Sequence, residues 1–176
     1  NDDKVLNNIN TAVHCVFECN DPHGDYYTSI IPCIQNDYNY PTIPHMINLP
    51  DTNDDLRKEL NIPDDSVVFG RLGGYEQFDI EYVKNVIIEY VSINKNVYFV
   101  FANTAKFCNL PNIFFLDKII DLVQKVKFIN SCNAMIWARS DGETFGLTIG
   151  EFSSKNKPII CCECGYNLKN ICYKIK

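Results

Sequence analysis

Short apolar runs alternate with segments of helical periodicity from about residue 66 to residue 161, and this alternation constrains the fold most strongly. Five of the runs are short enough for single strands, and they cover residues 66–70, 97–102, 126–129, 134–137 and 158–161. The second of these (VYFVFA) is apolar throughout, as expected for a strand buried on both faces. Strands separated by helices predict an α/β fold, a Rossmann-like parallel sheet with right-handed crossovers and flanking helices.

Three segments around these strands predict helices. After Asp79, which can cap a helix, five apolar side chains recur at helical spacing: Val83, Val86, Ile87, Tyr90 and Val91. A second helix is expected from about residue 145 to residue 155. A short helix is expected at residues 55–60, with Asp54 as its cap and Asn61 at its end.

The first forty residues are less regular. Residues 11–18 (TAVHCVFE) predict a strand, and a polar loop follows it. Prolines at 41, 44 and 50 then mark an extended connector (PTIPHMINLP), which is typical of a linker between domains.

Composition limits the classes of function. The net charge of -6 and the pI near 5.0 argue against nucleic acid as a partner, because phosphate backbones are bound by clustered Lys and Arg. The apolar runs at 97–102 and 113–116 are too short to cross a bilayer, and the N-terminal residues (NDDK) lack the layout of a signal peptide. We therefore expect a soluble, cytoplasmic protein without a transmembrane segment.

Nine cysteines are irregularly spaced along the chain. The tightest cluster is Cys161, Cys162 and Cys164, with Cys172 beyond it. Because the Cys161–Cys164 spacing is not paired with a second C-x-x-C and no His is nearby, reduced thiols are the main interpretation and a zinc site is the lesser one.

The first loop that could carry chemistry is Gly70-Arg71-Leu72-Gly73-Gly74, at the end of a predicted strand. Paired glycines let a backbone approach a ligand closely, and an arginine can bind phosphate oxygens with two N–H groups. Arg139 also follows a predicted strand. A glycine turn with a solvated arginine is the alternative interpretation of this loop.

The second loop runs from Ser140 to Leu147 (SDGETFGL) and leads into the predicted helix. A helix that begins near Phe145 directs its first N–H groups and its positive dipole end at the loop, which suits a diphosphate. Glu143 stands just before this helix, and Glu151 lies inside it. A capping or surface role is the alternative for either glutamate.

The spacing of these two acids resembles a known signature. Glu143 and Glu151 are separated by seven residues, as in the E-x7-E motif of group 1 retaining glycosyltransferases of the GT-B fold. The family's S-x-x-E-G-F-G-L pattern corresponds to residues 140–147, with threonine at one glycine position. Its closing E-A-x-A-x-G-x-P-V-I pattern aligns with residues 151–160, where Asn156 takes the glycine position of a left-handed turn.

The resemblance covers residues from about 45 to 161 and implies the C-terminal, nucleotide-sugar-binding domain of such an enzyme. It implies catalytic roles for Arg71, which would neutralise the donor diphosphate, and for Glu143, beside the transferred sugar. Glu151 would bind the ribose of the nucleotide. The other expected donor-binding residues are Gly73, Gly74, Arg139, Phe145, Gly146 and Leu147. A UDP- or GDP-sugar is the expected donor, and neither a metal nor another cofactor is expected.

The chain departs from the family in two respects. Glu76 and Gln77 stand where the family often has a lysine, so we expect Lys106 or Arg139 to supply a second phosphate contact. The acceptor-binding domain is also largely absent. We expect residues 1–44 to be a remnant of that domain with the interdomain linker, and residues 45–176 to be the donor-binding domain, truncated at its C-terminus.

Two functions stay open on these grounds. One is a retaining hexosyltransferase-type enzyme, which works alone or with a separate acceptor-binding domain. The other is a truncated, catalytically inactive remnant that binds nucleotide sugars. A receiver-like signalling domain is disfavoured, because Gly70-Arg71 stands at the first clear strand end, where such a domain needs an acidic cluster.

Overall fold

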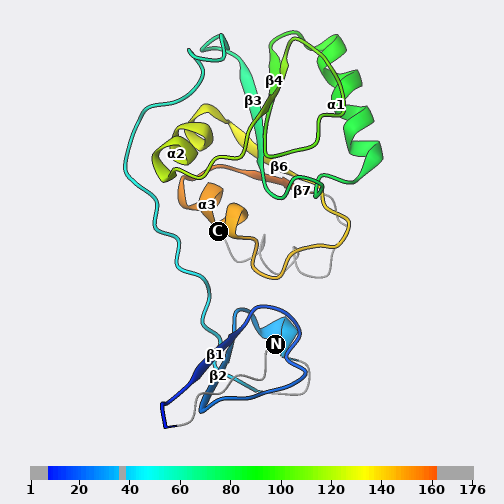
Figure 1. Cartoon of the computed structure of the whole chain (residues 1–176). Coiled ribbons are helices and arrows are strands. Elements are labelled where there is room, and N and C mark those ends of the chain that lie inside the picture. Colours follow the sequence, from blue (N-terminus) through cyan, green and yellow to red (C-terminus); the bar gives the residue numbers. More distant parts are fainter. Residues whose placement is uncertain (1–7, 36–38, 162–176) are drawn as a thin grey trace. The chain divides into compact units, whose positions relative to one another are not determined.

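The computed structural model describes residues 8–35 and 39–161 of the chain. The chain divides into two compact units (Figure 1). The first unit comprises Asn1–Met46 together with Glu143–Leu147, and the second comprises Ile47–Gly142 and Thr148–Lys176. Nothing in the sequence predicted that residues 143–147 would belong to the first unit.

The second unit contains a five-stranded parallel sheet, which confirms the predicted α/β, Rossmann-like class. Its strands stand in the order β5-β4-β3-β6-β7, and Figure 1 labels β3, β4, β6 and β7. Their bounds are β3 Val67–Leu72, β4 Val97–Ala102, β5 Ile113–Leu116, β6 Ala134–Trp137 and β7 Ile159–Cys161. β3 and β4 pair along their whole length, from Val67 opposite Val97 to Leu72 opposite Ala102. The apolar run that forms β5 was not predicted as a strand.

Three helices cover the two faces of the sheet: α1 Glu81–Ile93, α2 Leu122–Ser131 and α3 Leu147–Ser154 (Figure 1). α1 connects β3 to β4, whereas α2 and α3 belong to connections that run toward the opposite edge of the sheet. Right-handed crossovers in opposite directions place their helices on opposite faces. Because the strands are parallel, the loops that lead into these helices gather at the carboxyl edge, where ligands bind in such folds.

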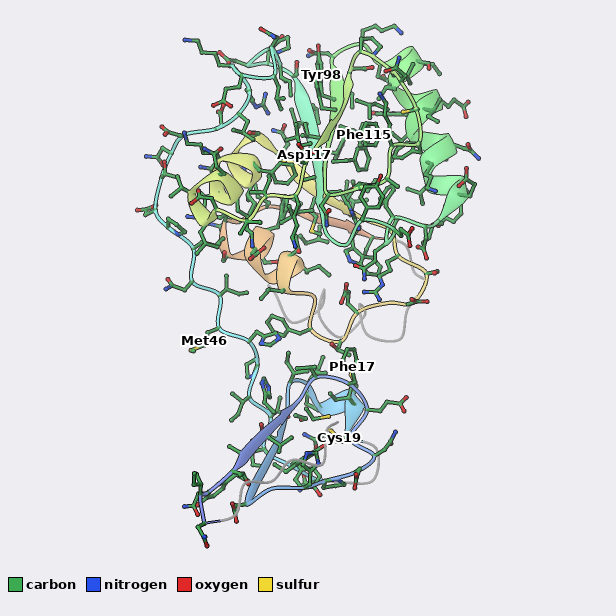
Figure 2. The ribbon with its side chains drawn as sticks, in the orientation of Figure 1. Phe17, Cys19, Met46, Tyr98, Phe115 and Asp117 are labelled. Carbon is green, nitrogen blue, oxygen red and sulfur yellow. The ribbon has the colours of Figure 1, made fainter. Side chains whose placement is uncertain are left out.

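Each face of the sheet has its own apolar core. Val68, Val100, Phe128, Ile129 and Phe152 belong to the core on the side of α2 and α3. On the side of α1 the core is rich in phenylalanine, and its rings pack against one another: the centroids of Phe101 and Phe115 are 5.3 Å apart. Figure 2 labels Phe115. Consecutive residues of β4 therefore alternate between two buried layers, which explains its unbroken apolarity.

A close approach to α2 explains one glycine of the predicted phosphate loop. A Cβ atom on Gly70 would overlap the Sγ atom of Cys132 and lie 3.3 Å from the ring of Phe128. Gly70 is therefore required for packing between β3 and the end of α2, not for an approach to a ligand.

Three local predictions are wrong. Residues 126–129 are not a strand but the buried turn of α2, and residues 55–60 form turns with one i→i+4 bond, from Leu60 N to Leu56 O, in place of a regular helix. Asp79 does not cap α1, which begins without a side-chain cap, because its carboxylate binds Ser140 instead. The left-handed turn predicted at Asn156 is confirmed, with φ of 56°, and Asn61 has a similar φ of 54°.

The first unit is small and built around two parallel strands, β1 Ala12–Cys15 and β2 Tyr26–Ser29, with a 3-10 helix η1 Pro32–Ile34. β1 lies inside the predicted strand at 11–18, whereas β2 was not predicted. A buried Gln35 joins its parts, since its Nε2 donates to Ser29 Oγ (2.5 Å) and to Tyr40 O (2.7 Å).

Two buried thiols lie in the core of the first unit. Cys15 and Cys19 pack there with Tyr27, Ile30 and Ile34, and both thiols are unoxidised. Burial raises the pKa of Cys19 to about 11, so this thiol stays protonated at neutral pH. Figure 2 labels Cys19 and its exposed neighbour Phe17.

In the part of the chain that the structure describes, no helix is long and apolar enough to cross a membrane.

Candidate functional site

Arg71 lies in β3, one residue before the end of the strand, and its guanidinium is buried. Nη1 donates to the carbonyl oxygen of Asn103 (3.1 Å) and to Thr104 Oγ1 (2.6 Å), both just beyond β4. Nη2 donates to the carbonyl oxygen of Gly74 (2.8 Å), and the guanidinium carbon lies 5.8 Å from the ring centroid of Phe78. Arg71 thus joins the loops that follow two neighbouring strands.

The same guanidinium leaves no room for a side chain at Gly73 of this loop. A Cβ atom on Gly73 would lie 2.7 Å from Arg71 Nη2, so a larger residue there would displace the guanidinium. Asn103, in a left-handed conformation with φ of 50°, donates from Nδ2 to the carbonyl oxygen of Gly73 (2.7 Å). The structure therefore brings Arg71, Gly73 and Gly74 together at the carboxyl edge of the sheet, as a braced loop.

A second contact at this edge joins the loop before α1 to the loop after β6. The carboxylate of Asp79 accepts from the backbone N–H of Ser140 (2.9 Å) and from its hydroxyl (2.5 Å). The hydrogen bond from the Ser140 side chain is the main cause of a lowered pKa of Asp79, and Arg139 contributes by charge attraction. Arg139 itself lies two residues beyond β6, with Nη2 3.7 Å from a carboxylate oxygen of Asp141.

The lowered pKa of Asp79 predicts a pH-dependent contribution to stability. Asp79 binds its proton more weakly in the folded chain than in the unfolded chain, so its contribution is present above the unfolded pKa. The contribution is then lost as the pH falls through the lowered pKa of the folded chain, below the ordinary Asp pKa of about 3.9. Asp79→Asn should lower the free energy of unfolding at pH 7 by at most about 1 kcal/mol, because the site is exposed.

Urea unfolding at pH 7 and at acidic pH checks this prediction. The difference between wild type and Asp79→Asn should shrink toward zero in acid. A difference that stays constant over this range would contradict it. Asp64→Asn, at an exposed position outside this contact, is the control and should show no such trend.

Glu151 lies on α3, and its side chain is 7% exposed. Its Oε1 lies 2.7 Å from Nζ of Lys125, which projects from α2 and is itself only 15% exposed. Sequence reasoning misses Lys125, because it predicts a strand at residues 126–129 in place of α2. Once α2 is recognised as a helix that packs on the same face as α3, a lysine beside a glutamate becomes a signal for an ion pair.

The remaining predicted residues lie between Glu143 and Leu147 and belong to the first unit, whereas α3 from Thr148 onward belongs to the second. The ring of Phe145 stands edge-on to His45, with centroids 5.3 Å apart, and packs against the core of the first unit. Gly146 has φ of 71°, a left-handed conformation that favours glycine. Glu143 is half-buried, and Leu147 is exposed at the first residue of α3.

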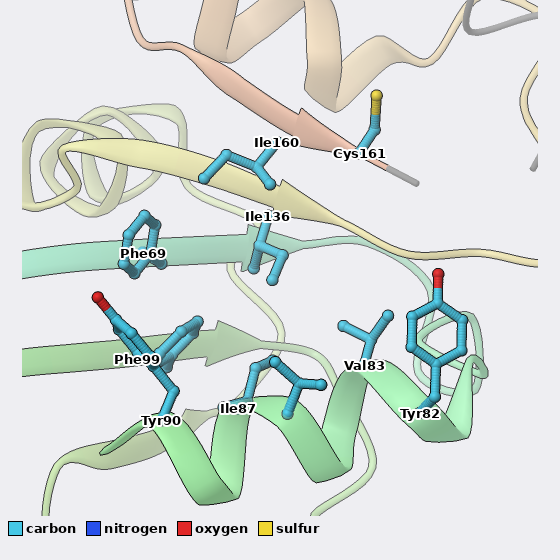
Figure 3. A pocket seen from close by; sticks show the side chains of 10 residues that line it. Phe69, Tyr82, Val83, Ile87, Tyr90, Phe99, Ile136, Ile160 and Cys161 are labelled. Carbon is cyan, nitrogen blue, oxygen red and sulfur yellow. The ribbon is translucent and has the colours of Figure 1, made fainter. Parts of the chain in front are cut away.

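A cavity of about 350 Å³ lies between α1 and the sheet (Figure 3). Val86 and Tyr90, which were predicted to pack on the sheet, line it and remain exposed. The cavity is lined by ten residues, and none of them is Lys, Arg, Asp or Glu. A diphosphate is bound by cationic side chains or N–H groups, so this cavity is not suited to it.

The sequence also raised a zinc site and a second phosphate contact as possibilities. Among residues 8–35 and 39–161, no group of three or more His, Cys, Asp or Glu side chains could hold a metal ion. Cys162, Cys164 and Cys172 of the predicted cysteine cluster lie outside the described residues. Lys106, a candidate for a second phosphate contact, is exposed and donates to Asn109 Oδ1 (3.1 Å).

Comparison with known proteins gives a likeness in fold. No family model matches the sequence, and no curated protein matches it. The crystal structure of TarM is similar over 82% of this chain and 31% of its own, with a TM-score of 0.56 and 14% identity.

Two crystal structures of Anabaena Alr3699/HepE are also similar. The one in complex with UDP and glucose has a TM-score of 0.48 at 18% identity, over 62% of this chain and 33% of its own. The one in complex with UDP-glucose has a TM-score of 0.49 at 15% identity, over 68% and 40%. The chain thus spans a third to two fifths of the length of these proteins. The likeness to TarM shows that the sheet and its helices have the fold found in GT-B glycosyltransferases.

Proposed function

We propose that the second unit is the donor-binding domain of a glycosyltransferase and that it binds a nucleotide diphosphate sugar. The observation that carries the proposal is Glu151, a buried carboxylate on the helix that follows β6. It occupies the second acidic position of the E-x7-E pattern, in a chain whose fold is that of GT-B enzymes. Burial of a carboxylate is costly unless its charge is paired, and here the charge of Glu151 is paired with Lys125.

In this proposal the donor lies across the carboxyl edge of the sheet. Arg71 supplies positive charge toward the diphosphate, and Gly73 and Gly74 allow the backbone to approach it. Arg139 adds a second cation after β6. Glu151 accepts hydrogen bonds from the ribose hydroxyls of the nucleotide.

The sugar end of the donor would be bound by residues that precede α3. α3 begins at Leu147, and the start of a helix favours an anion through its free N–H groups and its dipole. Glu143 would stand beside the transferred sugar. Transfer would retain the anomeric configuration, with electrostatic stabilisation of the departing diphosphate as the main source of rate and without a metal ion.

The donor nucleotide, the acceptor and the compartment are further parts of the proposal. UDP-glucose is the first probe, since it is the ligand in one HepE structure, and a GDP-sugar is the second. The acceptor would be presented by a domain that lies outside the second unit. Reduced, buried thiols such as Cys15 and Cys19 favour the cytoplasm, where thiols stay reduced.

Calorimetric titration with UDP-glucose, GDP-mannose and ADP-glucose tests the proposal. One of the three should bind with a Kd in the micromolar range, and the other two more weakly. Absence of binding by all three would contradict donor binding.

A transfer assay then distinguishes an enzyme from an inactive binding domain. NMR of the product would show whether the anomeric configuration is retained. Binding without transfer, also in the presence of an acceptor-binding domain, would favour the inactive alternative.

A further inference from the structure

The Lys125–Glu151 pair is the most buried ion pair between helices in the part of the chain that the structure describes. The Lys125 and Glu151 side chains are 15% and 7% exposed, and the N–O distance is 2.7 Å. The other pairs have one partner that is much more exposed: Lys127 on the same helix lies 3.3 Å from an Asp54 side chain that is 68% exposed. A pair that is shielded from water on both sides holds its geometry more firmly than a surface pair.

The contact with Lys125 involves only one of the two oxygens of the Glu151 carboxylate. Lys125 donates to Oε1 of Glu151, and no described residue donates to Oε2. A carboxylate has two oxygens and about four acceptor positions, so a ligand can still be bound through Oε2. With Oε1 fixed by Lys125, rotation of the carboxylate about its last torsion is restricted, and Oε2 keeps one direction.

We propose that Lys125 is a positioning residue for nucleotide recognition. It orients Glu151 so that Oε2 accepts hydrogen bonds from the 2′- and 3′-hydroxyls of the donor ribose. This inference rests on the donor-binding function proposed above and adds a residue from α2 to it. The pair thereby sets the preference of the site for ribonucleotides over nucleotides without a sugar diol.

When Lys125 is replaced, the proposal predicts a loss of discrimination between ribonucleotides and nucleotides without a sugar diol, and not only a loss of affinity. If the ion pair were purely structural, its removal would weaken the binding of all nucleotides equally, because the effect would act through the fold. Removal of a positioning residue weakens the binding of the ribonucleotide selectively, since only that ligand uses the oriented oxygen.

Titration calorimetry of the full chain with UDP and with 2′,3′-dideoxy-UDP tests this. Wild type should bind UDP about 10- to 100-fold more tightly, the range for hydrogen bonds to a charged group. Lys125→Met should reduce that ratio at least about fivefold while the dideoxy Kd stays within about threefold. Lys125→Arg, which keeps a cationic donor, should restore most of the ratio. Lys127→Met, which removes the exposed pair two residues along α2, should leave it unchanged.

The outcomes separate this inference from the function on which it rests. If wild type binds neither probe, donor binding itself is overturned. If Glu151→Gln abolishes the ratio and Lys125→Met leaves it intact, donor binding stands and the role of Lys125 is overturned. Should Lys125→Met lose the folded circular dichroism spectrum, Lys125→Gln replaces it, and an unchanged ratio in that variant overturns the inference in the same way.

Discussion

Phe128→Ala is expected to lower the free energy of unfolding by about 3–5 kcal/mol, the range for a large aromatic side chain removed from a core. Phe128 is fully buried on α2 and meets Phe152 of α3 edge-on, with ring centroids 6.1 Å apart. Its ring also lies against Gly70 of β3, so the cavity would open where the sheet and two helices meet.

Urea unfolding followed by circular dichroism measures this loss. Ile93→Ala, at an apolar position that is 73% exposed at the end of α1, is the control and should change the free energy by less than about 0.5 kcal/mol. Equal effects of the two substitutions would contradict the placement of Phe128 in the core. The helical assignment of residues 126–129 would then also be in doubt.

Arg71→Met should destabilise the second unit by about 2–4 kcal/mol and also weaken donor binding. Methionine keeps most of the length of the side chain but removes the donors to Asn103 O, Thr104 Oγ1 and Gly74 O. Buried acceptors that lose a donor cost about 1–3 kcal/mol each when they stay dry, and water entry reduces that sum. The charge that would meet the diphosphate is lost at the same time.

Two measurements separate the two effects of Arg71→Met. Thermal unfolding without ligand measures only the stability that the hydrogen bonds of Arg71 contribute. Titration of the folded variant with UDP-glucose measures the affinity that the charge of Arg71 contributes. Lys106→Met, which removes an exposed cation from the loop after β4, should leave stability within about 0.5 kcal/mol of wild type. An unchanged unfolding temperature for Arg71→Met would contradict the bracing role.

The sheet was largely predictable, and the errors have physical causes. β4 and β6 were predicted with their observed bounds because each is an unbroken apolar run of strand length. The same signal failed for residues 126–129, where Val126, Phe128 and Ile129 are buried within a single helical turn. Periodicity alone does not distinguish a short buried strand from one turn of a buried helix.

The strand-end positions of two candidate site residues were predictable, but their contacts were not. The sequence placed Arg71 and Arg139 at strand ends, and the structure has them there. It did not show that the Arg71 guanidinium braces two loops, because its acceptors Asn103 and Thr104 lie more than thirty residues further along the chain. It also missed Lys125, whose pairing with Glu151 depends on how two helices pack.

Comparison of Glu151→Gln with wild type tests the central claim most directly. Glutamine keeps the size of the side chain and removes the charge, so the fold is expected to survive. Titration with UDP-glucose should show a Kd raised about 10- to 100-fold, the range for lost hydrogen bonds to a charged group. Glu89→Gln, on the exposed side of α1, should bind as wild type does. Equal Kd values for wild type, Glu151→Gln and Glu89→Gln would contradict a donor site built on Glu151.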